Sequence, residues 1–391
     1  LYSRAIFPMA EALQPRQITD LSEISEIRKL IFDAIVQYRK MKNRGVVAIF
    51  KRDRFDKYSN FARIGNGSLG GKGRGLAFID AMIKRNPTFD NIEGVNVTVP
   101  KTVVLCTDIF DTFMESNNLY QIALSDISDE EILEHFLKAK LPEELKPDFL
   151  AFFDVVGKPI AVRSSSLLED SHYQPFAGIY STYMIPSLDD KNEMLRLLLD
   201  AIKAVYASVF YADSKAYMTA TSNVIDQEKM AIILQEVVGT QYNDRYYPSF
   251  AGVGRSINYY PINDEKAEDG VADLAIGLGK YIADGGRSLR FSPRHPNKVL
   301  QTSTLDLALR DTQTRFYALD MNRGEKPFSI DDGFNLLKLS VRDAEKDNSL
   351  RLMVSTYDPV DQMIRDGYYD GGRKVVTFAN ILQHEDFPLA S

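Results

Sequence analysis

Cysteine is almost absent from this sequence, which holds one among 391 residues. A single thiol cannot form a disulfide within the chain, and it cannot build a cysteine-rich metal site. The residue is Cys106, and it directly follows the apolar run Val103–Leu105. We therefore predict that Cys106 is an unreactive part of the core.

Long apolar runs and an excess of positive charge are also absent. No run reaches the roughly 20 apolar residues that a membrane-spanning helix needs, so we expect no membrane partner. The formal net charge is -7 and no basic tract occurs, which argues against nucleic acid as the main partner. The N-terminus has neither an initiator Met nor a signal-peptide pattern. We expect a cytoplasmic portion of a longer chain, large enough for two or three packed units.

Glycine, by contrast, is concentrated in Gly65–Gly75, where it supplies six of eleven residues. Successive N–H groups in such a loop can form an anion-binding concavity, and Lys72 adds a positive charge. Apolar residues then recur at helical spacing from Leu76 to Met82, so the loop is predicted to lead into a helix N-terminus. It is neither a Walker A loop, since no Ser or Thr follows the Lys, nor a dinucleotide fingerprint, since no clear strand precedes it and no βαβ unit surrounds it. A flexible surface linker is the alternative interpretation.

A second polar segment follows the short apolar run Ile160–Val162, which is predicted to be a buried strand. Arg163 comes next, and then Ser164–Ser166, which we expect in a loop that ends at Glu169–Asp170. A guanidinium at the end of a strand can donate paired hydrogen bonds to phosphate oxygens, and the serines add further donors. The alternative is that Arg163 is a salt-bridge partner without a ligand.

Together these segments resemble the nucleotide-binding domain of the phosphoenolpyruvate synthase and pyruvate phosphate dikinase family, which has an ATP-grasp fold. The family pattern is a GGKG loop, followed by a VRSS segment, an acidic residue, and FAG with a Thr. Similar segments follow in the family's order over roughly residues 60 to 295. The matching segments are Gly70-Gly71-Lys72-Gly73, Val99-Pro100, Val103–Leu105, Val162-Arg163-Ser164-Ser165, Glu169–Asp170, Phe176–Gly178, Thr182, Met230–Val238, Gly277–Gly279 and Gly285.

The resemblance implies an α+β fold, an ATP-grasp-like nucleotide-binding domain of two or three subdomains with an extra N-terminal helix. We expect a helical connector over residues 1–60, in which apolar residues recur at helical spacing from Ile18 to Met41. The first ATP-grasp subdomains are expected over 61–230. The second is expected over 231–391, truncated at its C-terminal end.

The resemblance also implies ATP as the ligand and a set of residues around it. Lys72 and Arg163 would position the phosphates and neutralise their charge, and the GGKG glycines would cap them. The strand end at Gln235–Val238 would line the adenine, although a plain strand end with solvated polar residues is the alternative. The predicted ATP-binding residues are Gly70, Gly71, Lys72, Gly73, Arg163, Gln235, Glu236, Val238 and Lys280, and the two predicted catalytic residues among them are Lys72 and Arg163.

The sequence departs from the family pattern in charge and in metal ligands. Lys280 stands where the family's GLGE segment has Glu, so it either contacts a phosphate or marks a different binding mode. The family holds Mg²⁺ on a DIEW-like strand and an LQTR-like strand, and neither pattern occurs after residue 300. Mg²⁺ is therefore expected for the full-length enzyme, with ligands unknown here. The family's carrier-histidine motif surrounds none of the four histidines, His135, His172, His295 and His384.

These features predict the ATP-binding domain of a phosphoenolpyruvate synthase-like kinase or phosphotransferase. It would position ATP for phosphoryl transfer to a carrier histidine on a downstream domain and then to pyruvate on a pyruvate-binding domain. This portion alone is expected to be inactive. A non-catalytic nucleotide-sensing or regulatory module of the same fold is the alternative, and a related kinase with another acceptor is a third interpretation.

Overall fold

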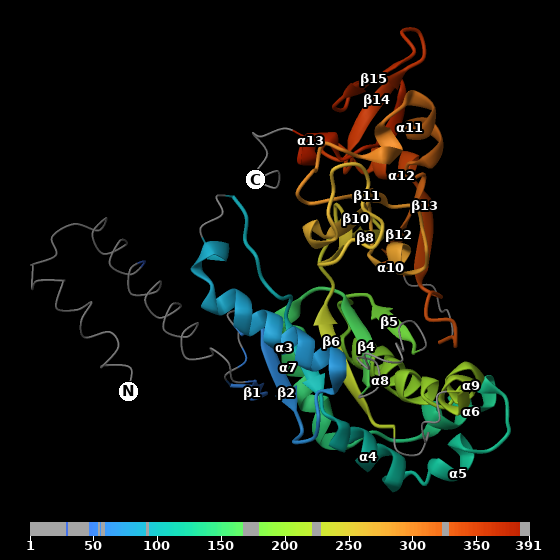
Figure 1. Cartoon of the computed structure of the whole chain (residues 1–391). Helices are drawn as coiled ribbons and strands as arrows, with labels where there is room; N and C mark the ends of the chain where they lie inside the picture. The colour runs from blue at the N-terminus through green and yellow to red at the C-terminus, as the bar shows by residue number, and fades with distance from the viewer. Residues whose placement is uncertain are drawn as a thin grey trace, which may run out of the picture.

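The computed structural model describes residue 29 and residues 47–53, 55, 59–90, 94–166, 180–220, 228–322 and 328–383. Apart from Lys29, the predicted N-terminal helix lies outside the described residues, as do Glu169–Asp170, His172, Phe176–Gly178 and His384. The described chain forms two lobes, each with its own sheets (Figure 1). The predicted α+β class is confirmed.

The first lobe is built on one six-stranded sheet. Its strands are β1 (Ala48–Ile49), β2 (Phe61–Ile64), β3 (Thr102–Leu105), β4 (Ile160–Ser166), β5 (Thr182–Ile185) and β6 (Met230–Glu236). Its helices are α3 (Gly70–Arg85), α4 (Thr107–Ser116), α5 (Tyr120–Ala123), α6 (Asp129–Lys138), α7 (Lys146–Val156), α8 (Lys191–Ser208) and α9 (Ala212–Ala220). The strand order is β1-β2-β3-β6-β4-β5, in which β1, β2 and β3 run parallel and the remaining pairs are antiparallel.

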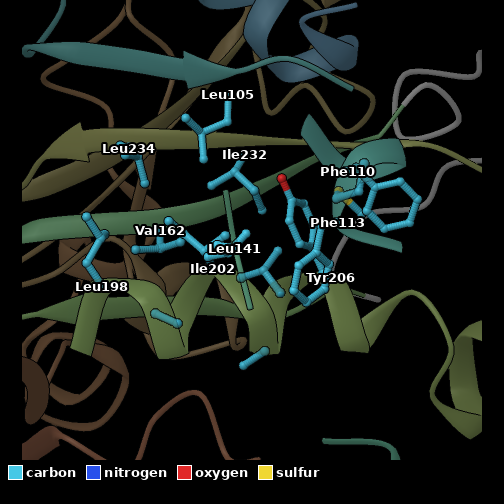
Figure 2. Packing of buried hydrophobic residues seen from close by; sticks show 14 of the residues in the cluster. Leu105, Phe110, Phe113, Leu141, Val162, Leu198, Ile202, Tyr206, Ile232 and Leu234 are labelled. Carbon is cyan, nitrogen blue, oxygen red and sulfur yellow. The ribbon is translucent and has the colours of Figure 1, made fainter. Parts of the chain in front are cut away.

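The central strand β6 is covered on both faces, which is why apolar residues fill it without alternation. Ile232 and Leu234 point into the large core, and Figure 2 shows them across from Leu198 and Ile202 of α8. Ile233 points to the other face and joins a smaller cluster that includes residues of α3. The sheet therefore separates α3 from the helices that cover its opposite face.

The second lobe holds three small antiparallel sheets over a shared hydrophobic core. Its strands are β7 (Thr240–Tyr242), β8 (Arg245–Tyr247), β9 (Ala251–Arg255), β10 (Val271–Ala275), β11 (Leu289–Phe291), β12 (Arg315–Asp320), β13 (Leu336–Ser340), β14 (Val354–Asp358), β15 (Met363–Asp366) and β16 (Arg373–Val376). Its helices are α10 (Lys280–Ala283), α11 (Leu305–Asp311), α12 (Val341–Lys346) and α13 (Ala379–Leu382). The strand orders are β13-β12-β8-β7, β11-β10-β9 and β15-β14-β16. None of the helices in the described part of the chain is both long and apolar enough to cross a membrane.

The serines after Arg163 lie in a strand and not in the expected loop. β4 continues because its pairing with β6 holds register from Arg163, opposite Ile233, to Ser166, opposite Met230. All three serines are fully buried. The hydrogen bonds of the sheet outweigh the local preference of serine for turns.

The glycine-rich segment also differs from expectation, because a strand does precede it. β2 leads into the segment, and β2 and β3 pair in parallel on either side of α3 in the sequence, so β2, α3 and β3 form a βαβ unit. α3 begins at Gly70, so the GGKG residues occupy its first turn. The predicted helix is confirmed, and the loop before it is shorter than predicted.

Two further expectations have clear outcomes in the fold. Cys106 is fully buried directly after β3, as predicted, and burial raises the pKa of its thiol. The expected boundary between residues 230 and 231 falls at the start of β6, which belongs to the first lobe's sheet. The chain therefore passes to the second lobe after β6 and not before it.

Gly70 is expected to tolerate no side chain. Its φ is +68°, and an added Cβ would lie 1.8 Å from the backbone oxygen of Ser165. Gly70→Ala should lower the free energy of unfolding by about 2–5 kcal/mol, the combined cost of a left-handed backbone and of overpacking. Chemical denaturation measures this change.

Gly75→Ala in the same helix is the matched control. Nothing lies within 4 Å of an added Cβ at Gly75, so alanine should raise the free energy of unfolding by about 0.5–1 kcal/mol. Equal effects of the two substitutions would contradict the close approach of α3 to β4.

Candidate functional site

The first turn of α3 lies against β4, at the residues that directly follow Arg163. Lys72 Nζ donates a hydrogen bond to Ser164 Oγ at 3.2 Å. Ser164 is the residue after Arg163 in β4. The structure therefore brings the GGKG and VRSS segments together, as the sequence predicted, although 92 residues separate Lys72 from Ser164.

Arg163 begins a chain of polar contacts across three neighbouring strands. Its Nη1 donates to Gln235 Oε1 at 2.9 Å, and Gln235 Nε2 donates to Thr102 Oγ1 at 3.0 Å. Gln235 lies directly opposite Thr102 on β3, and Arg163 is its diagonal neighbour on β4. These contacts orient the guanidinium on the sheet face that carries α3, so Gln235 positions Arg163.

The start of α3 is held against β4 through Ser165. Ser165 Oγ donates to the Leu69 carbonyl at 2.8 Å and accepts the Gly73 N–H at 2.9 Å. The Gly70 N–H donates to Ser68 Oγ at 3.2 Å. Within the described residues, the Gly71 N–H of this turn has no acceptor, which leaves it available at the helix N-terminus.

The strand end that was predicted to line adenine leads into the second lobe. The Glu236 carboxylate pairs with Lys158 Nζ at 2.6 Å, so this side chain has a partner on the first lobe. The Val237 N–H donates to the Pro159 carbonyl, and the Val237 carbonyl accepts the Tyr246 hydroxyl at 2.9 Å. Val238 is 54% exposed, and its N–H makes no hydrogen bond within the described part of the chain.

Lys280 begins α10 and lies between two carboxylates. Its Nζ is 3.2 Å from Asp332 Oδ1 and 3.5 Å from Asp284 Oδ1. Burial works against the Lys280 charge, but Asp332 and Asp284 outweigh it and raise the pKa of Lys280. The charge that departs from the family pattern is thus balanced within the chain, and a ligand role for Lys280 stays a prediction.

Asp332 joins the two lobes, and the sequence analysis missed it. Its Oδ2 accepts the Thr182 N–H of β5 at 2.9 Å while its Oδ1 faces Lys280. The segment 328–335, called here the interlobe strap, makes further contacts with β5. Ile330 accepts the Tyr183 hydroxyl at 3.1 Å, and Phe328 lies 4.9 Å from the Tyr183 ring between centroids. An Asp-Asp-Gly turn is the sequence signal, but nothing local to it indicates a partner in another lobe.

The described residues hold no preformed cluster of metal ligands. They contain no cluster of three or more His, Cys, Asp or Glu side chains that could hold a metal ion. β12 ends at Asp320, yet the residue two positions later is Asn322, whose N–H donates to Asp320 Oδ1. Mg²⁺ in nucleotide sites usually takes one or two carboxylates and completes its octahedral shell with phosphate oxygens and water.

The fold and the meeting of these segments define a nucleotide-binding domain of the ATP-grasp type. A family model described as pyruvate phosphate dikinase, AMP/ATP-binding domain, matches residues 66–344, and the chain belongs to this family. The match continues past residue 295 and includes β12 and β13.

A curated relative supports the same class of protein. The uncharacterized phosphotransferase YvkC of Bacillus subtilis (strain 168) is 27% identical over 190 residues, which are 48% of this chain and 20% of the relative. The chain thus spans about a fifth of the length of the relative it matches.

The contact between Lys280 and Asp332 is expected to couple the lobes energetically. Each side chain is less than a quarter exposed. A double-mutant cycle of Lys280→Met, Asp332→Asn and the double variant should therefore give a coupling free energy of about 0.5–3 kcal/mol between the two residues. The Asp332→Asn variant keeps a side-chain oxygen for the Thr182 N–H, so the cycle isolates the charge. Denaturation of the four proteins measures it. The exposed Lys298–Asp264 pair is the control and should couple much more weakly. Additive effects at Lys280 and Asp332 would remove this link between the lobes.

Proposed function

We propose that this chain is the ATP-binding domain of a phosphotransferase of the phosphoenolpyruvate synthase and pyruvate phosphate dikinase type. It positions ATP for transfer of a phosphoryl group to a carrier histidine on a domain outside this chain, and that group then passes to pyruvate. The observation that carries the proposal is the meeting of Lys72 and the Arg163 segment at the N-terminus of α3.

The phosphates are assigned to the start of α3. Its first turn combines the Lys72 ammonium, the Gly71 N–H and the positive end of the dipole of a 16-residue helix. Arg163, oriented by Gln235, adds a guanidinium on the same sheet face. Charge neutralisation and fixed orientation are what phosphoryl transfer requires of a protein.

The adenine is assigned to the end of β6. Val237 is fixed through both of its backbone groups, so the following Val238 N–H is presented from a rigid position. Such an N–H pairs with a ring nitrogen, and the exposed Val238 side chain covers part of the base. Glu236, whose carboxylate pairs with Lys158, contributes through its backbone.

A nucleotide-sensing module of the same fold is the second candidate. One observation favours it: Lys280 is balanced by two carboxylates. A longer chain with its downstream domains separates the candidates. Formation of phosphoenolpyruvate from ATP and pyruvate supports the enzyme, and ATP binding without turnover supports the sensor.

ATP binding by this 391-residue chain is expected to depend little on Mg²⁺. The dissociation constant from calorimetric titration should change less than about threefold, or under about 1 kcal/mol, when Mg²⁺ is removed with a chelator. The reason is that the phosphate contacts proposed here come from cations and N–H groups. A much larger loss would mean that carboxylates of this chain hold the metal, and the proposed phosphate site would be wrong in that respect.

Arg163→Ala is expected to weaken ATP binding about 10- to 100-fold, since a hydrogen bond to a charged group contributes about 1.5–3 kcal/mol. The same titration measures the change, and a thermal melt checks that the variant is folded. Arg196→Ala is the control, because Arg196 is exposed on α8 and pairs with Glu193 and Asp200. Parental affinity in a folded Arg163→Ala variant would show that Arg163 does not bind phosphate.

A further inference from the structure

The glycine-rich loop before α3 has its backbone N–H groups turned toward α4. The Asn66 and Gly67 N–H groups donate to the two oxygens of the Asp108 carboxylate, each at 2.9 Å. The Ser68 N–H donates to Thr107 Oγ1 at 3.0 Å, and the Thr107 N–H donates back to the Ser68 carbonyl. Three successive N–H groups that were expected to face an anionic ligand thus face a resident carboxylate and a hydroxyl.

Close approach explains the glycines of this loop. A Cβ at Gly65 would lie 2.5 Å from Asp108 Oδ1, and a Cβ at Gly67 would lie 2.6 Å from both the Asp108 backbone nitrogen and Thr107 Oγ1. Gly65 also has a φ of +95°, which side chains rarely allow. These two glycines therefore permit contact with α4, while Gly70 permits contact with β4.

The loop is consequently held at both ends before any ligand arrives. Thr107 and Asp108 hold residues 66–68 from α4, and Ser165 holds Leu69 and Gly73 from β4. In the sequence, Lys72 lies between Leu69 and Gly73, the two residues that Ser165 binds. A displacement of the loop toward or away from α4 would therefore shift the first turn of α3 and the base of the Lys72 side chain.

We infer that Asp108 and Thr107 are positioning residues for the phosphate end of the proposed ATP site. This inference depends on the proposed function. The Asp108 carboxylate occupies the N–H groups of residues 66–67, so it does not touch the nucleotide. It fixes the loop and, through the loop, the Lys72 and Gly71 donors. Less conformational entropy is then lost when the nucleotide binds.

The test compares the affinities of Asp108→Asn and the parent for ATP and for adenosine. An Asn side chain offers one acceptor oxygen, and its amide group cannot accept the second N–H. ATP affinity should fall about tenfold and adenosine affinity should stay within about twofold, because one loop N–H loses its acceptor only at the phosphate end. A variant with a purely structural defect would lose both affinities together.

Thr107 supplies a second, milder variant. Thr107→Val has nearly the same shape without the acceptor for the Ser68 N–H and should reduce ATP affinity about three- to tenfold. Thr107→Ser keeps the hydroxyl and should retain the ATP affinity of the parent. Asp111→Asn is the control on the same helix, because Asp111 pairs with Lys229 and does not contact the loop.

Amide hydrogen exchange provides a measurement without nucleotide. In Asp108→Asn, exchange of the Asn66 and Gly67 amides should accelerate about tenfold or more while the amides of β4 stay protected. Unchanged exchange, or ATP affinity equal to or tighter than that of the parent, would overturn the positioning role. If the parent chain binds no ATP, the proposed function is wrong and this inference is wrong with it. That outcome differs from a failure of the positioning role alone, because it is seen in the parent before any substitution is made.

Discussion

The contact between the first turn of α3 and the middle of β4 determines the geometry of everything around it. β4 pairs with β5 as far as Arg163 and with β6 as far as Ser166, so Ser165, opposite Ala231 of β6, occupies a fixed place in the sheet. Its hydroxyl binds the helix start through both a carbonyl and an N–H group. Because the helix start is fixed, the Lys72 side chain reaches β4, where its Nζ donates to Ser164 Oγ. The serines that sequence reasoning placed in a loop are therefore the support of the site.

Two separate connections relate this support to the second lobe. One is the end of β6, where Val237 is bound by Pro159 on one lobe and Tyr246 on the other. The second is the interlobe strap, which binds the sheet-edge strand β5 through Asp332 and aromatic contacts. A single flexible hinge would leave the lobes free to rotate about it. Two connections on different strands restrict that rotation, which would lower the ordering cost of the nucleotide binding proposed here.

Sequence patterns were informative wherever the cause of the structure is local. The apolar run of β6, the helix after the glycines and the burial of Cys106 follow from composition and spacing, and all three are confirmed. The partners of the loop N–H groups could not be predicted, because Asp108 and Thr107 come 39 to 42 residues after the loop residues they bind. The strand β2 was missed because its four residues FARI include a charged side chain and no long apolar run. Asp332 was missed for the same reason as Asp108, because only the tertiary fold brings its partner Thr182 close to it.

Nucleotide binding and phosphoryl transfer make different demands on the charges of the proposed site. In the proposed site Lys72 and Arg163 bind the phosphates, and each is hydrogen-bonded to a neighbouring hydroxyl or amide group. Lys280, by contrast, is one positive charge beside two negative ones, so the three side chains together keep a net negative charge. Binding a polyphosphate requires neutralised charge, which two cations and a helix N-terminus can supply. Transfer of a phosphoryl group also requires that charge be stabilised on the oxygens between which the group moves, a task that bound metal ions perform. On the proposed function, Lys72 and Arg163 serve the first task, and a metal ion bound together with the nucleotide would serve the second.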